Sequence, residues 1–277
     1  MIISHNSEKE QPTDRLKTAI VGRYKVGKSW LCATARRPIL FIDHDLRAEA
    51  LAGKPGVFVK SFKDGAWFMQ PTAFQETIDV ITKLEDSLCL APLFPEANLP
   101  ADLRVATLVF DSGQSLSASA MRQGLFGSKE IRRSIVFGSY TAHIPKSFDG
   151  WQSEMKAVED LVIRVMGLPV DFLITMHETA EEATDSTEET PKYTGRTGVY
   201  PPRLKNLLKN FNEVWRVDLA PAMPADPKNP GLYLPRVQCR PDYKFDACTA
   251  MKLDQFEEPN IEKMIAKHLE RSKYEQG

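Results

Sequence analysis

Four residues near the start of the chain have the types and spacing of a phosphate-binding loop. Gly22, Gly27, Lys28 and Ser29 fit the pattern G-x-x-x-x-G-K-[ST]. In such a loop backbone N–H groups surround the β-phosphate, the lysine reaches the β- and γ-phosphates, and the hydroxyl ligates Mg²⁺. The loop follows the apolar run LKTAIVG and precedes the helix-favouring KSWLCATAR, so we prefer this interpretation to a plain strand-to-helix turn. The predicted nucleotide-binding residues are Gly22, Arg23, Tyr24, Lys25, Val26, Gly27, Lys28, Ser29 and Trp30.

Carboxylates end two further apolar runs. Asp111 ends LVFDS, the form of a Walker B strand, whose acid holds Mg²⁺ together with the loop serine, Ser29. FIDHD offers Asp43 and Asp45, and hydrolysis needs a group that positions water near the γ-phosphate. We expect Asp45 to project into the crevice and take that role, with Asp43 supporting the structure. Acids that merely end a strand for solubility are the alternative.

A histidine ends the run DFLITMH. His177 could sense the γ-phosphate and pass its state to the following segment, or it could be an ordinary hydrogen-bonded histidine at a strand terminus. Ser112 and Glu178 are read as neighbours of these sites. The predicted catalytic residues are Lys28, Asp45, Asp111 and His177.

Apolar runs alternate with helical patterns along the chain. We expect strands at 16–22, 38–45, 56–62, 104–112, 169–178 and 211–220, and helices at 28–36, 71–88, 113–126, 151–167 and 259–274. A further helix starts in YPPRLKNLLKN, and a late hairpin is expected in GLYLPRVQCR and DYKFDAC. Segments 127–150 and 179–198 read as loops. The alternation predicts an α/β fold with a mostly parallel central sheet and a crevice at the strands' carboxyl ends.

Bulk properties limit the remaining possibilities. The 277 residues are 42% hydrophobic and 26% charged. The net charge is −1, so the overall charge of the chain gives no indication of nucleic-acid binding. The four cysteines form no C-x-x-C pair, which argues against structural zinc. No signal-peptide pattern or membrane-length apolar run occurs, and we expect a cytoplasmic protein without membrane contact. The predicted organisation is a flexible tail at 1–15, an ATPase core at 16–220, and a C-terminal hairpin and helix packed on the core at 221–277.

Taken together, GRYKVGKS, FIDHD, LVFDS and LITMHE resemble the core of the RecA-like P-loop ATPases. The downstream TGRTGVYPPRLKNLLKNFNEVWRVDL is similar to phage ATP-binding proteins of that group, small recombinases proposed to anneal single strands. The resemblance covers roughly residues 17–245. It implies a RecA-like fold, ATP and Mg²⁺, homo-oligomers with nucleotide near subunit interfaces, single-stranded DNA bound by two loops, and a single-strand-binding protein as partner. A phage-encoded protein would act in the host cytoplasm.

Carried over by position, the two DNA-binding loops would be residues 113–150 and 179–198. The first contains cations with interleaved aromatics, as single-strand binding uses, although a solvated helix face is the alternative. Its predicted DNA-binding residues are Arg122, Lys129, Arg132, Arg133 and Tyr140. The second departs from the pattern, because six carboxylates between 178 and 190 would repel a phosphate backbone.

Two more features bear on the resemblance. Asp45 stands where RecA-like proteins usually have Glu, and the shorter side chain could slow hydrolysis. Arg240 and Lys244 on the late hairpin could reach a neighbouring subunit's γ-phosphate, or could simply be surface residues.

The sequence thus predicts a Mg²⁺-dependent ATPase that binds single-stranded DNA and promotes annealing or recombination. The main rival is a P-loop ATPase that acts as a protein-interaction switch without DNA, its acidic loop contacting a basic partner. A duplex DNA motor would need Glu beside the Walker B acid, where Ser112 stands. A nucleotide kinase would need a basic lid, and the 178–190 segment has the wrong charge.

Overall fold

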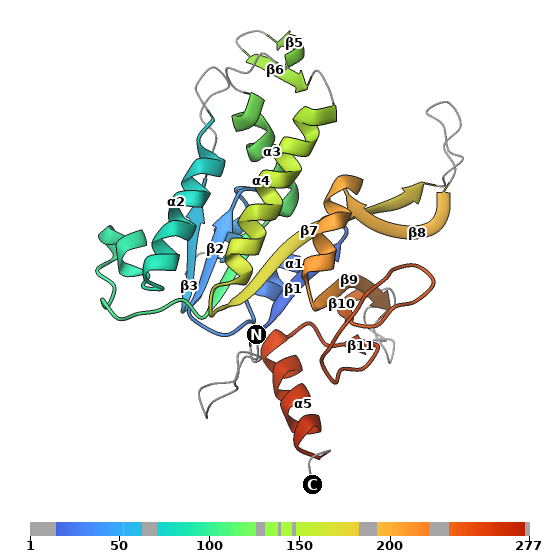
Figure 1. Cartoon of the computed structure of the whole chain (residues 1–277). Coiled ribbons are helices and arrows are strands. Elements are labelled where there is room, and N and C mark those ends of the chain that lie inside the picture. Colours follow the sequence, from blue (N-terminus) through green and yellow to red (C-terminus); the bar gives the residue numbers. More distant parts are fainter. Residues whose placement is uncertain are drawn as a thin grey trace, which may run out of the picture.

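The computed structural model describes residues 15–51, 53–62, 71–125, 131–137, 140–145, 148–182, 193–221 and 233–274. Its centre is one sheet, which helices cover on both faces (Figure 1). The strand order is β11-β10-β9-β1-β7-β4-β2-β3, with β8 paired to β7. The strands are β1 Lys17–Gly22, β2 Ile39–Asp43, β3 Val57–Ser61, β4 Thr107–Asp111, β7 Asp171–Glu182, β8 Tyr193–Tyr200, β9 Glu213–Pro221, β10 Tyr233–Gln238 and β11 Phe256–Glu257.

The inner six strands, β9 to β3 along that order, are all parallel. Gly22 at the end of β1 stands level with His177 of β7 and Val217 of β9, and Asp43 stands level with Asp111. Parallel strands end at the same edge, so this register brings the predicted chemical groups together. The predicted mostly parallel α/β sheet is confirmed.

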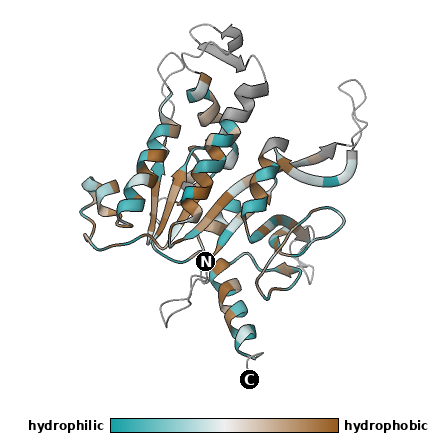
Figure 2. Cartoon of the chain, in the orientation of Figure 1, coloured by the Kyte–Doolittle hydropathy of each residue, from teal (hydrophilic) through white to brown (hydrophobic). Residues whose placement is uncertain are grey.

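Alternate residues of each strand enter two separate cores, as the two-residue period of a strand requires. Ala19 and Val21 of β1 face a core formed with α2 Ala73–Asp86, α3 Gly113–Leu125, α4 Phe148–Met166 and η5 Pro202–Asn210. Ile20 faces the other core, with α1 Lys28–Cys32 and α5 Ile261–Tyr274. Figure 2 shows the central strands mostly brown and the helices banded with teal. Continuous apolar strands buried on both faces explain why the sequence runs are apolar throughout.

Three expectations about connections were wrong. Residues 127–150 are not one loop, because β5 Ile131–Phe137 and β6 Tyr140–Pro145 pair as an antiparallel hairpin and α4 already starts at Phe148. Residues 179–198 are not a loop throughout, since β7 continues to Glu182 and pairs with β8. The late hairpin forms between β9 and β10, whereas DYKFDAC contains only an isolated bridge from Cys248 to Val214.

Two expected helices are altered. α1 covers only Lys28–Cys32 rather than 28–36, and the segment after the prolines at 201–202 is a 3₁₀ helix. The other expected helices form, with shifted ends. Of the expected tail, residues 1–14 lie outside the described residues, and the division into core and appendage stays a prediction.

Candidate nucleotide site

The phosphate loop connects the buried strand β1 to α1. Gly27 has φ 98°, a left-handed conformation that favours glycine, and a Cβ there would meet no atom within 4 Å. Gly22 is constrained differently, because a Cβ on it would lie 2.6 Å from the carbonyl oxygen of Val217. Open space beside Gly27 and close packing at Gly22 suit a backbone that wraps an anion. The loop residues therefore fit the nucleotide phosphates that their sequence predicts.

Lys28 points back into its own loop. Its Nζ donates hydrogen bonds to the carbonyl oxygens of Gly22 at 2.9 Å and Arg23 at 2.8 Å, and lies 3.2 Å from Nδ1 of His177. Burial lowers the pKa of Lys28 to about 8, although Asp111, Asp45 and Glu178 act in the opposite direction. A buried ammonium surrounded by acceptors is a strong site for an incoming phosphate.

His177 supplies one of these acceptors. Because the Lys28 ammonium only donates, Nδ1 of His177 accepts and the ring proton resides on Nε2. Burial and, next, the Lys28 charge lower the pKa of His177, which keeps the imidazole neutral. The Tyr24 ring lies 5.8 Å from the imidazole, centroid to centroid. The histidine in the middle of β7 is therefore in direct contact with the phosphate-loop lysine.

Ser29 and Asp111 form a hydroxyl–carboxylate pair across the crevice. Ser29 Oγ donates to Asp111 Oδ2 at 2.5 Å, and the buried Thr175 hydroxyl donates to Oδ1. Burial raises the pKa of Asp111, while the two hydroxyl hydrogen bonds lower it. Hydroxyl and carboxylate oxygens are ligands that Mg²⁺ prefers. The pair fits the predicted metal role, with Thr175 as a supporting group that the sequence analysis missed.

The two acids of FIDHD have different surroundings. Asp43 is fully buried and accepts hydrogen bonds from the backbone N–H groups of Asp45, Arg47 and Ala48 and from the Ser61 hydroxyl. Asp45 is partly exposed and accepts from the hydroxyls of Ser112 and Ser115. Asp43 thus holds the loop that carries Asp45. The Asp45 charge lies close enough to Lys28 and His177 to oppose, in part, the lowering of both pKa values by burial.

A buried ion pair lies beside the loop. Glu178 accepts two hydrogen bonds from Arg216, at 2.7 and 3.2 Å, and the two side chains are only 3% and 6% exposed. The exposed Arg23 of the phosphate loop also reaches Glu178, at 3.1 Å. Because β7 and β9 flank β1, this pair joins the strands on both sides of the loop. An arginine inside the apolar run EVWRV was the sequence signal for such a pair.

Exposed aromatic rings flank the loop, each beneath a cation. Tyr24 is 51% exposed with the Arg47 guanidinium 4.5 Å from its ring centroid, and Trp30 is 53% exposed with Lys54 Nζ at 3.4 Å. Lys25 and the buried Val26 complete the loop. Flat exposed rings beside a phosphate site can pack against a nucleobase.

The residues predicted to bind DNA are separated from this site. Arg122 is exposed near the end of α3, and Arg132, Arg133 and Tyr140 occupy backbone positions in the β5–β6 hairpin. Lys129 lies outside the described residues. Figure 1 shows the hairpin at the top, beyond the ends of α3 and α4. Helix α3 starts at Gly113, two residues after Asp111. It therefore lies along the chain between Asp111, the predicted Mg²⁺ ligand, and the hairpin.

The two residues proposed to act on a neighbouring subunit are both exposed. Arg240 follows β10 and lines a hollow with Arg271 and Tyr274 of α5. The Lys244 ammonium lies 5.5 Å from the Tyr243 ring centroid. Their action toward a second subunit stays a prediction.

Comparison with known proteins settles the family. A family model described as an AAA domain matches residues 14–234. This chain belongs to that AAA domain family. Among solved structures, the chain is similar to the RadB recombinase at 13% identity and a TM-score of 0.37, over 80% of this chain and 87% of that one. No curated protein matches the sequence significantly.

The AAA domain assignment agrees with the mostly parallel sheet and the phosphate loop, and it implies nucleotide binding. Within the described part of the chain no helix is long and apolar enough to cross a membrane. The same part contains no cluster of three or more His, Cys, Asp or Glu side chains arranged to hold a metal.

Proposed function

We propose that this AAA domain protein is a Mg²⁺-dependent ATPase that binds single-stranded DNA and promotes strand annealing or recombination. The observation that carries the ATPase part is the 2.5 Å pair between Ser29 and Asp111 next to the buried Lys28 ammonium. Ser29 and Asp111 would hold the Mg²⁺ that bridges the phosphates, and Lys28 would neutralise the transferred phosphoryl oxygens.

Asp45 is the group we assign to the attacking water. Its carboxylate is partly exposed at the strand-end crevice, and Ser112 and Ser115 fix its orientation by donating to one oxygen. Among the described residues no protein group donates to the second oxygen, which can therefore accept a proton from water. His177 contacts Lys28 directly and begins the β7–β8 extension, so it can transmit γ-phosphate occupancy.

The DNA part rests on the basic and aromatic composition of the β5–β6 region. Arg122 sits in the last turn of α3, and Arg132 and Arg133 follow in β5. Clustered cations neutralise backbone phosphates, and Tyr140 offers a ring for base stacking. Strand β6 of the hairpin contacts α3 and α4, so the hairpin is joined to the helix that follows Asp111.

ATP hydrolysis by the wild type and Lys28→Ala, with and without a single-stranded oligonucleotide, tests the proposal. We expect a low basal rate that rises with the oligonucleotide and falls by about a hundredfold or more in the variant. A Lys28-dependent rate that is indifferent to DNA would refute coupling to DNA and favour the protein-interaction switch.

A second measurement isolates the DNA site. The double variant Arg132→Glu/Arg133→Glu should weaken oligonucleotide binding and reduce the slope of log affinity against log salt by about 0.7 for each DNA phosphate that it no longer neutralises. Lys83→Glu, an exposed charge reversal on α2, is the matched control. An equal effect of both variants would mean that only the net charge matters.

A further inference from the structure

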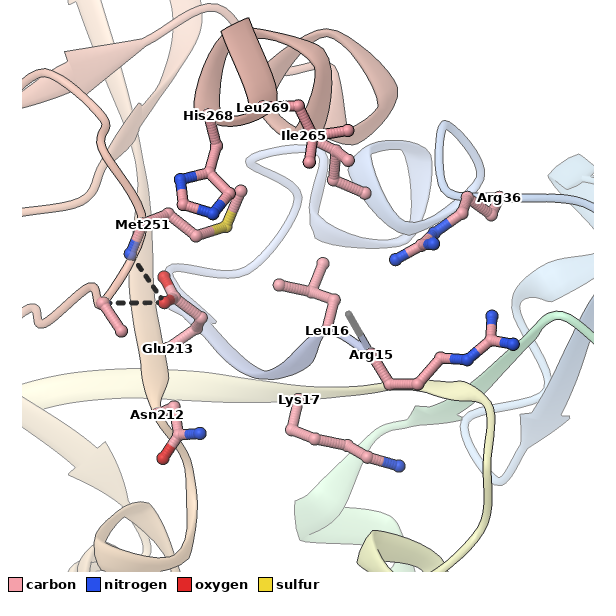
Figure 3. Close-up of a pocket in the computed structure, with 11 residues that line it drawn as sticks. Arg15, Leu16, Lys17, Arg36, Asn212, Glu213, Met251, Ile265, His268 and Leu269 are labelled. Carbon is pink, nitrogen blue, oxygen red and sulfur yellow. Dashed lines mark hydrogen bonds between the residues drawn. The ribbon is translucent and has the colours of Figure 1, made fainter. Parts of the chain in front are cut away.

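A second hollow lies at the edge of the sheet opposite to the phosphate loop. It is a cavity of about 360 Å³ between the start of β1, the start of β9 and α5. Figure 3 shows Arg15, Lys17 and Arg36 extending on one side of Leu16, while Glu213, Met251 and His268 lie on the other. The volume is within the range of ligand pockets, and the cavity shares no residue with the nucleotide site.

One wall of this hollow is cationic. Arg36 binds Asp171 at 2.7 Å, and Lys17 donates to the carbonyl oxygens of Leu168 and Val170, so both are fixed in place. Arg15 is exposed, and within the described part of the chain its guanidinium makes no hydrogen bond or ion pair. Arg15 therefore presents its donors to the cavity mouth, where an incoming carboxylate can take them.

The single carboxylate of the lining does not cancel this charge. Glu213 is buried, and its oxygens accept hydrogen bonds from the backbone N–H groups of Ala250 and Met251 and from Nε1 of Trp215. His268 Nδ1 accepts from the N–H of Lys252, which leaves Nε2–H as a donor. Apart from the Asn212 amide, which can both donate and accept, the polar groups that remain for a ligand are thus donors, and they favour an acceptor-rich, anionic partner.

The apolar part of the lining is aliphatic or thioether: Leu16, Ala250, Met251, Ile265 and Leu269. Leu269 is 47% exposed although it is apolar. Met251 is flexible and polarisable, a residue suited to surfaces that accept different side chains. The hollow thus combines an apolar floor with a cationic rim.

An adjoining hollow favours a chain rather than a small molecule. A cavity of about 480 Å³, lined by Arg240, Lys252, Arg271 and Tyr274, shares Met251 with the first. Across the two hollows six Lys or Arg side chains line the surface with one carboxylate, Glu213, while Asp171 pairs with Arg36 and Asp254 with Arg271 from outside the lining, so the cations remain in excess. We call the two together the α5 groove.

We propose that the α5 groove binds an acidic peptide segment of a partner protein, with an apolar side chain seated on Leu16, Met251 and Leu269. Aspartate or glutamate side chains pair with Arg15 and Arg240, which lie on different hollows. A nucleic acid would need a series of stacking platforms, and the described lining of the groove offers only the rings of Tyr274 and His268, one in each hollow. The position opposite to the phosphate loop allows partner and nucleotide to bind at the same time.

Fluorescence anisotropy with a labelled peptide of alternating Asp and Leu tests the proposal on the full chain. We expect saturable binding that is lost when Asn replaces Asp or when Ser replaces Leu in the peptide. Arg15→Glu combined with Arg240→Glu should weaken binding by about tenfold, and Leu269→Ser should also weaken it. Thermal melts of each variant verify folding, and Lys83→Glu on α2 is a control for a single charge reversal away from the groove, to be compared with Arg15→Glu and Arg240→Glu made singly.

Several outcomes would overturn the proposal. They are absence of binding, equal weakening by Lys83→Glu, and full displacement by inorganic phosphate or by an oligonucleotide, which would assign the groove to small anions or to nucleic acid. Lys28→Ala should bind the peptide as the wild type does, because Lys28 lies at the other edge of the sheet. The outcome is therefore independent of whether the protein hydrolyses ATP.

Discussion

The buried pair Glu178–Arg216 offers the sharpest test of how the site is held. Glu178→Gln removes the negative charge but keeps the shape, so the Arg216 guanidinium, 6% exposed, loses its main partner. Breaking a buried ion pair from one side costs about 3–5 kcal/mol of unfolding free energy. The glutamine oxygen still accepts one hydrogen bond, and Asp218 remains 3.5 Å from Arg216, so we expect the lower end, about 3 kcal/mol.

Urea unfolding of three variants measures this effect. Glu178→Gln should lower the unfolding free energy by about 3 kcal/mol, whereas Arg23→Gln, whose side chain is 76% exposed, should change it by less than about 1 kcal/mol. The double variant Glu178→Gln/Arg216→Met should recover most of the loss, since an apolar pair leaves no orphaned charge. If the double variant is no more stable than Glu178→Gln, an unpaired arginine is not the cause, and our reasoning is wrong.

Three further predictions concern other parts of the chain. Gly22→Ala should abolish nucleotide binding in a titration, because the added Cβ would lie 2.6 Å from the Val217 carbonyl oxygen. The helix content should stay unchanged. An affinity equal to that of the wild type would show that β9 can move aside. Asp43→Asn should lower the unfolding free energy by about 1–3 kcal/mol and slow turnover, because the amide NH₂ would face backbone N–H donors; a loss of turnover without lower stability would contradict this role. Hydrogen bonds from Arg271 and Lys267 lower the pKa of Asp254, so the ionised carboxylate stabilises the fold above about pH 4, and this stabilisation is lost as the pH falls. Asp254→Asn should therefore lose less stability on acidification than the wild type. Melting curves recorded from neutral to acidic pH would show the difference.

The sequence predicted best those features that depend on a short, continuous stretch of residues. A strand that is apolar throughout and ends in an acid or glycine predicts both the parallel sheet and its reactive edge, and β1, β2 and β4 form accordingly. The β5–β6 hairpin was missed because a register shift between Ile131 and Arg133 breaks the two-residue alternation. The end of β7 was missed because residues beyond His177 pair only with β8 and gain no two-sided burial to require apolar side chains.

Groups that depend on distant pairing could not be read from spacing. Thr175 donates to Asp111 from 64 residues away, and Arg216 meets Glu178 across 38 residues. The first follows only once β7 is known to pair with β4, and the second only once β1 is known to lie between β7 and β9. The α5 groove likewise joins β1, β9 and α5, which the chain separates by most of its length.

Strand β7 has a mechanical consequence for the site. Its first half pairs with both β1 and β4, whereas the backbone beyond His177 pairs with β8, and the Glu178 side chain binds Arg216 of β9. Five residues of extended chain span about 17 Å, so a tilt of about 10° at His177 moves the far end by about 3 Å. Because one continuous backbone spans both halves, a small adjustment of His177 beside Lys28 would produce a larger displacement near Glu182.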